Sequence, residues 1–227
     1  MTAKFPQVRA MVFDAYGTLF DVGAAVASCD DIAPPQRAAL AALWRDKQLQ
    51  YTWLRGLQKR HADFGQVTAE ALDYALEATG LANPELRQRL LALYQTLEAY
   101  PEVSAALEAL RARGLVTAIL SNGTPGMLRA AVEHAGISHL LDHVLSVEEV
   151  GVFKPAPEVY QLAVDRLGIP AHQIGFVSAN GWDAYAASAF GFQVIWCNRA
   201  GQPAERLPGA PRAVVRGLGE LPTLMAE

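Results

Sequence analysis

Residues 8–18 read VRAMVFDAYGT, so that an apolar run ends at Phe13 and is followed directly by Asp14 and a glycine turn. Such a run predicts a short buried β-strand. Asp14 then stands at the carboxyl end of this strand, where a carboxylate is costly unless it is paired or used. Asp also favours turns, so the pattern alone does not separate a functional residue from a turn residue.

Similar apolar runs recur along the chain, and helical patterns lie between most of them. The further predicted strands cover residues 115–120, 174–177, 193–197 and 213–215. The predicted helices cover residues 103–113, 125–135, 156–167 and 182–190, and each is followed by glycine, a common C-cap. This alternation predicts an α/β fold, in which a parallel sheet carries helices on both faces and the ligand crevice lies beyond the carboxyl ends of the strands.

Residues 20–97 interrupt the alternation because they contain no convincing strand. They are predicted to form three or four helices, among them residues 35–57, 68–79 and 84–96. We therefore expect a helical cap domain of residues 20–97, inserted into a core domain that consists of residues 1–19 and 98–227.

The 227 residues are 52% hydrophobic and 19% charged, which is the composition of an ordinary globular protein. The formal net charge is -4 and no long Lys/Arg stretch is present, which argues against nucleic acid and membrane surfaces as partners. Cys29 and Cys197 show neither disulfide nor metal spacing, which fits free thiols in a reducing compartment. The apolar run before Asp14 is too short for a signal peptide or a membrane span, so we expect a cytoplasmic protein.

Polar residues form three more clusters, two of them directly after the predicted strands at residues 115–120 and 174–177 and one just before the predicted helix at residues 156–167. They are Ser121-Asn122-Gly123, Lys154-Pro155 with Tyr160 in the next helix, and Ser178-Ala179-Asn180-Gly181-Trp182-Asp183. Each cluster by itself is explained by helix capping or by surface exposure. Together they bring a hydroxyl, an ammonium and two carboxylates to one edge of the sheet, which favours nucleophilic catalysis: Lys154 would keep Asp14 ionised, and Asp183 would orient Lys154 or a water.

The order Asp-x-x-x-Thr, Ser-Asn, Lys-Pro and a late Asp resembles the four-motif signature of the haloacid-dehalogenase superfamily, over nearly the whole chain. Most members are magnesium phosphatases with a second Asp two residues after the nucleophile and an acidic pair in the fourth motif; this sequence has Tyr16 and Ala179 there. A phosphatase needs carboxylates for Mg²⁺ and an acid for the leaving group, whereas a departing halide needs no proton. The stretches FDAYGTLFDV, LWRDKQLQYTWLR and FVSANGWDA are similar to the (S)-2-haloacid dehalogenase branch.

This resemblance implies a Rossmann-like core with a helical cap and the hydrolytic dehalogenation of short-chain 2-haloalkanoic acids to 2-hydroxy acids. The reaction would proceed with inversion at C2, through an ester on Asp14, without metal or cofactor. The catalytic residues it implies are Asp14, Thr18, Arg45, Ser121, Lys154, Tyr160, Ser178, Asn180 and Asp183. The substrate and halide would contact Tyr16, Arg45, Leu49, Phe64, Ser121, Asn122 and Trp182. The partners would be a small 2-haloacid and water, and a homodimer is a family expectation.

Three other interpretations remain open at this point. The first is a phosphatase of the same superfamily, and the second is a catalytically silent binding protein on this fold. The third is a relative that opens a strained ring by the same carboxylate attack. His139 and His143 have the spacing of a helical metal pair, but no Glu-rich companion motif accompanies them and neither stands beside a predicted strand end. We therefore interpret them as structural.

Overall fold

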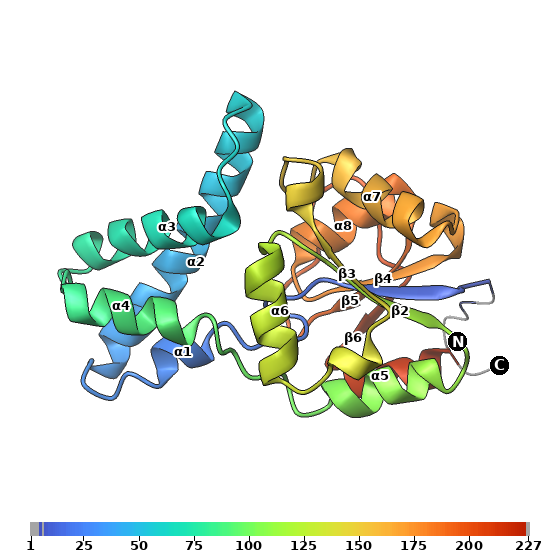
Figure 1. Ribbon diagram of the computed structural model, residues 1–227, viewed down its shortest axis with the longest axis horizontal. Coiled ribbons are helices and arrows are strands. Elements are labelled where there is room, and N and C mark those ends of the chain that lie inside the picture. The colour runs from blue at the N-terminus through green and yellow to red at the C-terminus, as the bar shows by residue number, and fades with distance from the viewer. Residues whose placement is uncertain (1–4, 6, 226–227) are drawn as a thin grey trace.

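The computed structural model describes residue 5 and residues 7–225 and contains one six-stranded sheet in the order β3-β2-β1-β4-β5-β6 (Figure 1). Its strands are β1 (Ala10–Phe13), β2 (Val116–Ser121), β3 (His143–Ser146), β4 (Ile174–Ser178), β5 (Gln193–Cys197) and β6 (Ala213–Val215). All five strand pairings are parallel. This is the strand order of a doubly wound, Rossmann-like sheet, and the predicted fold class is confirmed.

Helices cover both faces of the sheet, with α7 and α8 on one side and α5 on the other (Figure 1). They are α5 (Val103–Arg111), α6 (Pro125–His134), α7 (Pro157–Leu167), α8 (Gly181–Phe190) and α9 (Leu221–Leu224), with short 3-10 turns η1 (Ser138–Leu140), η2 (Val147–Glu149), η3 (Ala171–Gln173) and η4 (Leu218–Glu220). Gly168 and Gly191 end α7 and α8 at φ 63° and 118°, in the left-handed region that glycine adopts at little cost. The four helices predicted within residues 103–190 begin and end within two residues of α5, α6, α7 and α8.

Strand β3 was not predicted from the sequence. It has four residues, of which only Leu145 and Ser146 are buried, and it pairs with β2 at the edge of the sheet. A short, half-exposed edge strand gives a weak hydrophobic pattern. His139 and His143 do not share a helix, because His139 lies in η1 and His143 begins β3, so the spacing of a helical metal pair does not apply to them.

Between β1 and β2 the chain forms a separate group of helices, which lies beside the sheet (Figure 1). They are α1 (Ala24–Ala27), α2 (Pro34–Gln58), α3 (Phe64–Ala78) and α4 (Pro84–Leu93). Helix α3 begins four residues before its predicted start because Asp63 caps it, accepting a hydrogen bond from the Gln66 N–H at 2.9 Å. Phe20 and Ala99 form an antiparallel bridge, so the chain leaves and re-enters the sheet region at adjacent points.

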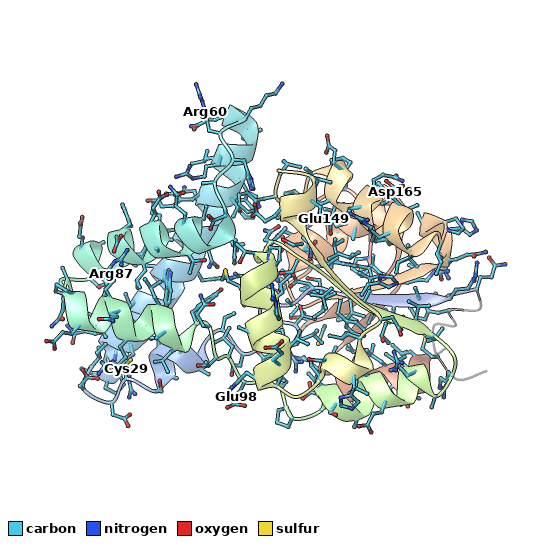
Figure 2. All side chains as sticks on the ribbon, in the orientation of Figure 1. Cys29, Arg60, Arg87, Glu98, Glu149 and Asp165 are labelled. Atoms are coloured by element: carbon cyan, nitrogen blue, oxygen red, sulfur yellow. The ribbon has the colours of Figure 1, made fainter. Side chains whose placement is uncertain are left out.

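Charged side chains lie on the outside of this structure, as Figure 2 shows for Arg60, Arg87 and Asp165. Among the residues that the structure describes, the charged side chains that are buried are those of Asp14, Lys154 and Asp183, which are 7%, 1% and 0% exposed. Charged residues are seldom buried without a partner, so this group directs attention to the carboxyl edge of the sheet.

Both cysteines are buried and free, as the sequence predicts. Cys29 lies in the helical group, far from the strands (Figure 2), and Cys197 ends β5. Burial raises the pKa of the Cys197 thiol to about 11, which keeps it protonated. No helix among the described residues has both the length and the apolar character that a membrane crossing requires.

Candidate active site

Asp14 is the first residue after β1, and hydrogen bonds hold both of its carboxylate oxygens. Its backbone N–H continues the sheet by donating to the Val177 carbonyl at 2.9 Å. Oδ1 accepts from Lys154 Nζ at 3.1 Å, and Oδ2 accepts from Thr18 Oγ1 at 3.0 Å and Asn180 Nδ2 at 2.8 Å. The carboxylate is thereby fixed in one orientation at the carboxyl end of the central strand.

Thr18 reaches Asp14 because the chain turns back at Gly17, whose φ of 89° lies in the left-handed region. The Thr18 hydroxyl oxygen accepts a hydrogen bond from the Ala179 N–H at 2.8 Å. Its proton is therefore directed to Asp14 rather than to the neighbouring loop.

Lys154 connects the two buried carboxylates. Its Nζ lies 3.1 Å from Asp14 Oδ1 and 2.9 Å from Asp183 Oδ2, and it lies 4.9 Å from the centre of the Phe176 ring. Burial alone lowers the pKa of Lys154, but the charges of the two carboxylates outweigh it and the net direction is upward. The lysine therefore stays an ammonium at neutral pH.

Tyr160 completes this network by donating a hydrogen bond to Asp183 Oδ1 at 2.8 Å. Burial and the charge of Asp183 raise the pKa of Tyr160 well above its ordinary value, so its hydroxyl remains a donor. Burial also raises the pKa of Asp183, against the effect of Lys154, and Asp14 adds to the rise because two carboxylates share one ammonium.

The predicted loop residues shape the rest of this edge. Ser121 Oγ accepts from the Gly123 N–H at 3.1 Å, and Ser178 Oγ accepts from the Asn180 N–H at 3.1 Å. Asn122 Oδ1 accepts from the Lys154 N–H at 3.0 Å, which ties two of the predicted clusters together. Serine hydroxyls and the asparagine NH₂ can still donate to a ligand while their oxygens accept these bonds.

Arg45 approaches the same edge from helix α2. Its Nη2 donates to Asn180 Oδ1 at 3.1 Å and its Nη1 donates to Gln48 Oε1 at 2.7 Å. Asn180 therefore touches both Arg45 and Asp14 through the two ends of one side-chain amide. The contact between Arg45 and Asn180 joins the helical group to the sheet edge. Through Asn180, the Arg45 guanidinium is linked to the carboxylate of Asp14.

Aromatic rings form an apolar wall beside these groups. The Tyr16 ring lies 5.7 Å from Phe64 and 5.4 Å from Tyr94, and the Trp182 ring lies 5.5 Å from Trp53 of α2. Among the described residues, Tyr16 Oη and Trp182 Nε1 are buried without a hydrogen-bond partner, an uncommon state that suits contact with a ligand. Burial raises the pKa of Tyr16 well above its ordinary value.

Leu49 is half-buried one turn after Arg45 on α2. Gln48, Thr68 and Tyr94 were missed by the sequence reasoning. Gln48 bonds to Arg45, and Thr68 and Tyr94 bond to Gln48. No sequence motif distinguishes these three residues from ordinary residues of a helix.

A Mg²⁺ ion of the kind that most phosphatases of this superfamily use does not fit these residues. Lys154 already takes one oxygen of Asp14 and one of Asp183, and Tyr16 and Ala179 offer no carboxylate. In the part of the chain that the structure describes, no group of three or more His, Cys, Asp and Glu side chains could hold a metal ion.

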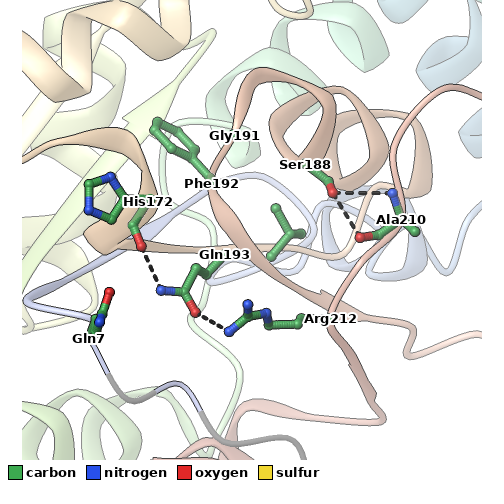
Figure 3. A pocket seen from close by; sticks show the side chains of 9 residues that line it. Gln7, His172, Ser188, Gly191, Phe192, Gln193, Ala210 and Arg212 are labelled. Carbon is green, nitrogen blue, oxygen red and sulfur yellow. Dashed lines mark hydrogen bonds between the residues drawn. The ribbon is translucent and has the colours of Figure 1, made fainter.

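A surface hollow of about 510 Å³ lies elsewhere, at the amino end of β5. Figure 3 shows that its polar side chains bond to their own surroundings: Gln193 donates to the His172 carbonyl and accepts from Arg212, and Ser188 bonds to the Ala210 backbone. The ligand crevice of a doubly wound sheet is at the opposite end, so this hollow does not carry the chemistry.

Comparisons with known proteins agree with the geometry. A family model described as haloacid dehalogenase-like hydrolase matches residues 8–191. The chain is 46% identical over 219 residues to (S)-2-haloacid dehalogenase 1 of Pseudomonas sp. (strain CBS-3), covering 96% of each chain. A dehalogenase crystal structure at 42% identity covers 98% of this chain and 99% of its own with a TM-score of 0.95. The L-2-haloacid dehalogenase of Xanthobacter autotrophicus, solved with chloropropionic acid covalently bound, is 38% identical with a TM-score of 0.88 and covers 96% of this chain and 98% of its own.

Proposed function

The chain belongs to the haloacid dehalogenase-like hydrolases, and from this premise we propose that it is an (S)-2-haloacid dehalogenase that works through an ester on Asp14. The observation that carries the proposal is the arrangement of Asp14 itself. Its carboxylate is held by three donors at the carboxyl edge of the sheet, next to an arginine and without the ligands of a metal site. The substrate would be a short-chain 2-haloacid, and water would be the second reactant.

In the first step, a carboxylate oxygen of Asp14 attacks C2 of the substrate from the side opposite the halogen. A C–O bond forms while the C–X bond breaks, and the halide leaves with the bonding electron pair. We assign Oδ1 as the attacking oxygen, because it accepts one of the hydrogen bonds described above and Oδ2 accepts two. Ser121 would donate to the carboxylate of the substrate.

The departing halide would be received by Arg45, Asn122 and Trp182. A guanidinium is permanently charged and weakly hydrated, which suits an anion in a partly dry site. The buried Trp182 Nε1–H lacks a partner among the described residues and can donate to the halide. Tyr16, Leu49 and Phe64 would line the apolar side of the substrate.

In the second step, water attacks the ester carbonyl carbon of Asp14. The developing oxyanion is then at Oδ2, where Thr18 and Asn180 already donate, which is the arrangement of an oxyanion hole. Asp183, whose pKa burial raises, would take up the proton of the water, while Lys154 and Tyr160 hold it in place. The bond between the carbonyl carbon and the ester oxygen then breaks, and Asp183 returns its proton to the departing alkoxide oxygen, which becomes the hydroxyl of the 2-hydroxy acid. The other proton of the attacking water passes to solvent, and Asp14 is restored as a carboxylate.

The experiment that tests this function is an assay of halide release from (S)-2-chloropropionate in the presence of EDTA. Activity is expected to persist, because Lys154 supplies the positive charge that a metal would otherwise bring to Asp14. Loss of activity with EDTA and its return with Mg²⁺ would show a metal-dependent reaction. Hydrolysis of p-nitrophenyl phosphate without any halide release would favour the phosphatase interpretation.

The stereochemical course provides a second prediction. Attack from the rear inverts C2, and hydrolysis at the Asp14 carbonyl leaves C2 untouched, so (S)-2-chloropropionate should yield (R)-lactate. Chiral chromatography of the product measures this outcome, with chemically hydrolysed racemate as the reference. Retention of configuration would contradict a single displacement at C2.

The halide-accepting role of Arg45 provides a third prediction. Arg45→Ala is expected to lower kcat/KM for (S)-2-chloropropionate by at least about tenfold, because the leaving group loses its cation. The matched control is Arg55→Ala on the same helix, since Arg55 pairs with Glu70 and not with the site. Equal activity of a folded Arg45→Ala variant and the control would remove Arg45 from the mechanism.

A further inference from the structure

We propose that Gln48 is a positioning residue that orients the guanidinium of Arg45 for the departing halide without neutralising it. The inference rests on the proposed function and extends it to a residue that no motif marks. Gln48 lies on α2 one turn after Trp44 and is 1% exposed. An uncharged amide buried to this degree is costly unless its polar atoms are all paired.

Each end of the Gln48 amide has a partner in a different part of the helical group. Oε1 accepts from Arg45 Nη1 at 2.7 Å, and Nε2 donates to Thr68 Oγ1 of α3 at 2.8 Å. Nε2 also donates to the hydroxyl of Tyr94, which directly follows α4, at 3.1 Å. Through Gln48, the Arg45 guanidinium is thus linked to α3 and to the residue that follows α4.

The hydrogen bonds of Thr68 decide which way the Gln48 amide faces. The Thr68 hydroxyl donates its proton to the Phe64 carbonyl at 2.6 Å, so its oxygen can only accept from Gln48. The NH₂ group of Gln48 must therefore face Thr68, which leaves the carbonyl oxygen facing Arg45. Trp44 Nε1 donates to the Thr68 carbonyl at 2.9 Å and holds this turn of α3 in place.

The hydrogen-bond acceptors of the Arg45 guanidinium carry no charge. Both described partners of the Arg45 guanidinium, Gln48 Oε1 and Asn180 Oδ1, are neutral amide oxygens. A carboxylate at either position would cancel the positive charge and compete with the halide. An arginine has five N–H donors, so these two bonds leave others for an anion. Arg45 and Gln48 are both among the residues that line a cavity of about 60 Å³.

The simpler alternative is that Gln48 only fastens α2 to α3. The two roles differ in their dependence on the leaving group. Chloride is a poorer leaving group than bromide and carries more developed charge when it departs, so its transition state depends more on Arg45. A helix-fastening role would affect both substrates equally, and a positioning role would affect the chloride substrate more.

The test measures kcat/KM for (S)-2-chloropropionate and (S)-2-bromopropionate, a parameter that reports the steps up to halide departure. Gln48→Met is expected to lower the value for the chloride substrate about tenfold and that for the bromide substrate at most about threefold. Gln48→Glu is expected to lower kcat/KM for the chloride substrate more than Gln48→Met does, because a carboxylate in place of the amide neutralises the Arg45 guanidinium. The control is Gln50→Met on the same helix, where Gln50 is exposed and bonds only to Lys47 among the interactions described.

Thr68→Val is a milder second variant in case Gln48→Met does not fold, since it removes only the hydroxyl that sets the amide orientation. It should show the same greater loss for the chloride substrate. Equal losses for the two substrates in either folded variant, or no loss, would overturn the role of Gln48 while the wild type remains active. Absence of halide release by the wild type would instead overturn the proposed function, and this inference with it.

Discussion

Replacing Asp14 with asparagine is expected to lower halide release by about 10⁴-fold or more, because an amide oxygen is a poor nucleophile. The side chain keeps its shape, so the fold is expected to survive, and a thermal unfolding curve checks this. Asp21→Asn is the matched control: it lies on the same loop, and its Oδ1 accepts from the Gly23 N–H rather than facing the site. A folded Asp14→Asn variant with near-normal turnover would remove Asp14 from the nucleophile role.

Loss of activity alone does not separate a nucleophile from a general base that activates water. A single turnover in ¹⁸O-water, with enzyme in excess over haloacid, distinguishes them. In the ester mechanism the oxygen that joins C2 comes from Asp14, and solvent oxygen enters the carboxylate. The product hydroxyl should therefore be almost unlabelled, and the peptide that contains Asp14 should carry the label. Label in the product and none in the peptide would make Asp14 a base.

The second large effect is expected from Lys154→Met, which leaves two buried carboxylates without their shared cation. Removing one partner from a buried ionic group costs about 3–5 kcal/mol, and we expect a decrease of this size in the free energy of unfolding, measured by urea denaturation. Halide release should be lost as well. Lys47→Met is the control, because Lys47 bonds to Gln50 on the outside of α2 and its removal should cost less than about 1 kcal/mol.

A double variant separates the loss of charge pairing from the loss of packing. Asp183→Asn in the Lys154→Met background removes one uncompensated charge and should recover part of the lost stability. A further loss in the double variant would mean that packing, not charge, dominates at this position.

The pH dependence of the Lys154 contribution follows from the direction of its pKa shift. Because the pKa is raised in the folded state, the contribution is fully present below the ordinary lysine value of 10.5 and is lost as the pH rises through the folded pKa. The stability difference between wild type and Lys154→Met should thus be constant near neutral pH and shrink only in strongly alkaline solution. A difference that already disappears near pH 7 would contradict this assignment.

Much of the fold was predictable because its elements carry strong local patterns. The central strand before Asp14 is apolar throughout, and glycines with positive φ follow α7 and α8, where the chain must turn. Strand β3 was not predictable in this way, because an edge strand with an exposed half does not need a continuous apolar run. The end of α4 at Leu93 was also not predicted, since the residues after it remain compatible with a helix.

The sequence by itself determined which polar residues stand at the ends of parallel strands. The carboxyl ends of such strands share one edge of the sheet, so Asp14 and the segment of residues 178–183 could be expected from the sequence alone to lie near one another. Lys154 follows β3, which was not predicted, and only its motif indicated that it belongs with them. Only the tertiary structure decided how Arg45 is held. Its contact with Asn180 depends on how α2 packs against the sheet. Gln48 lies three residues after Arg45 on the same helix, but the orientation of its amide depends on the Thr68 hydroxyl of α3, whose proton is donated to the Phe64 carbonyl. Residue spacing specifies the face of a helix, but packing between helices specifies what that face touches.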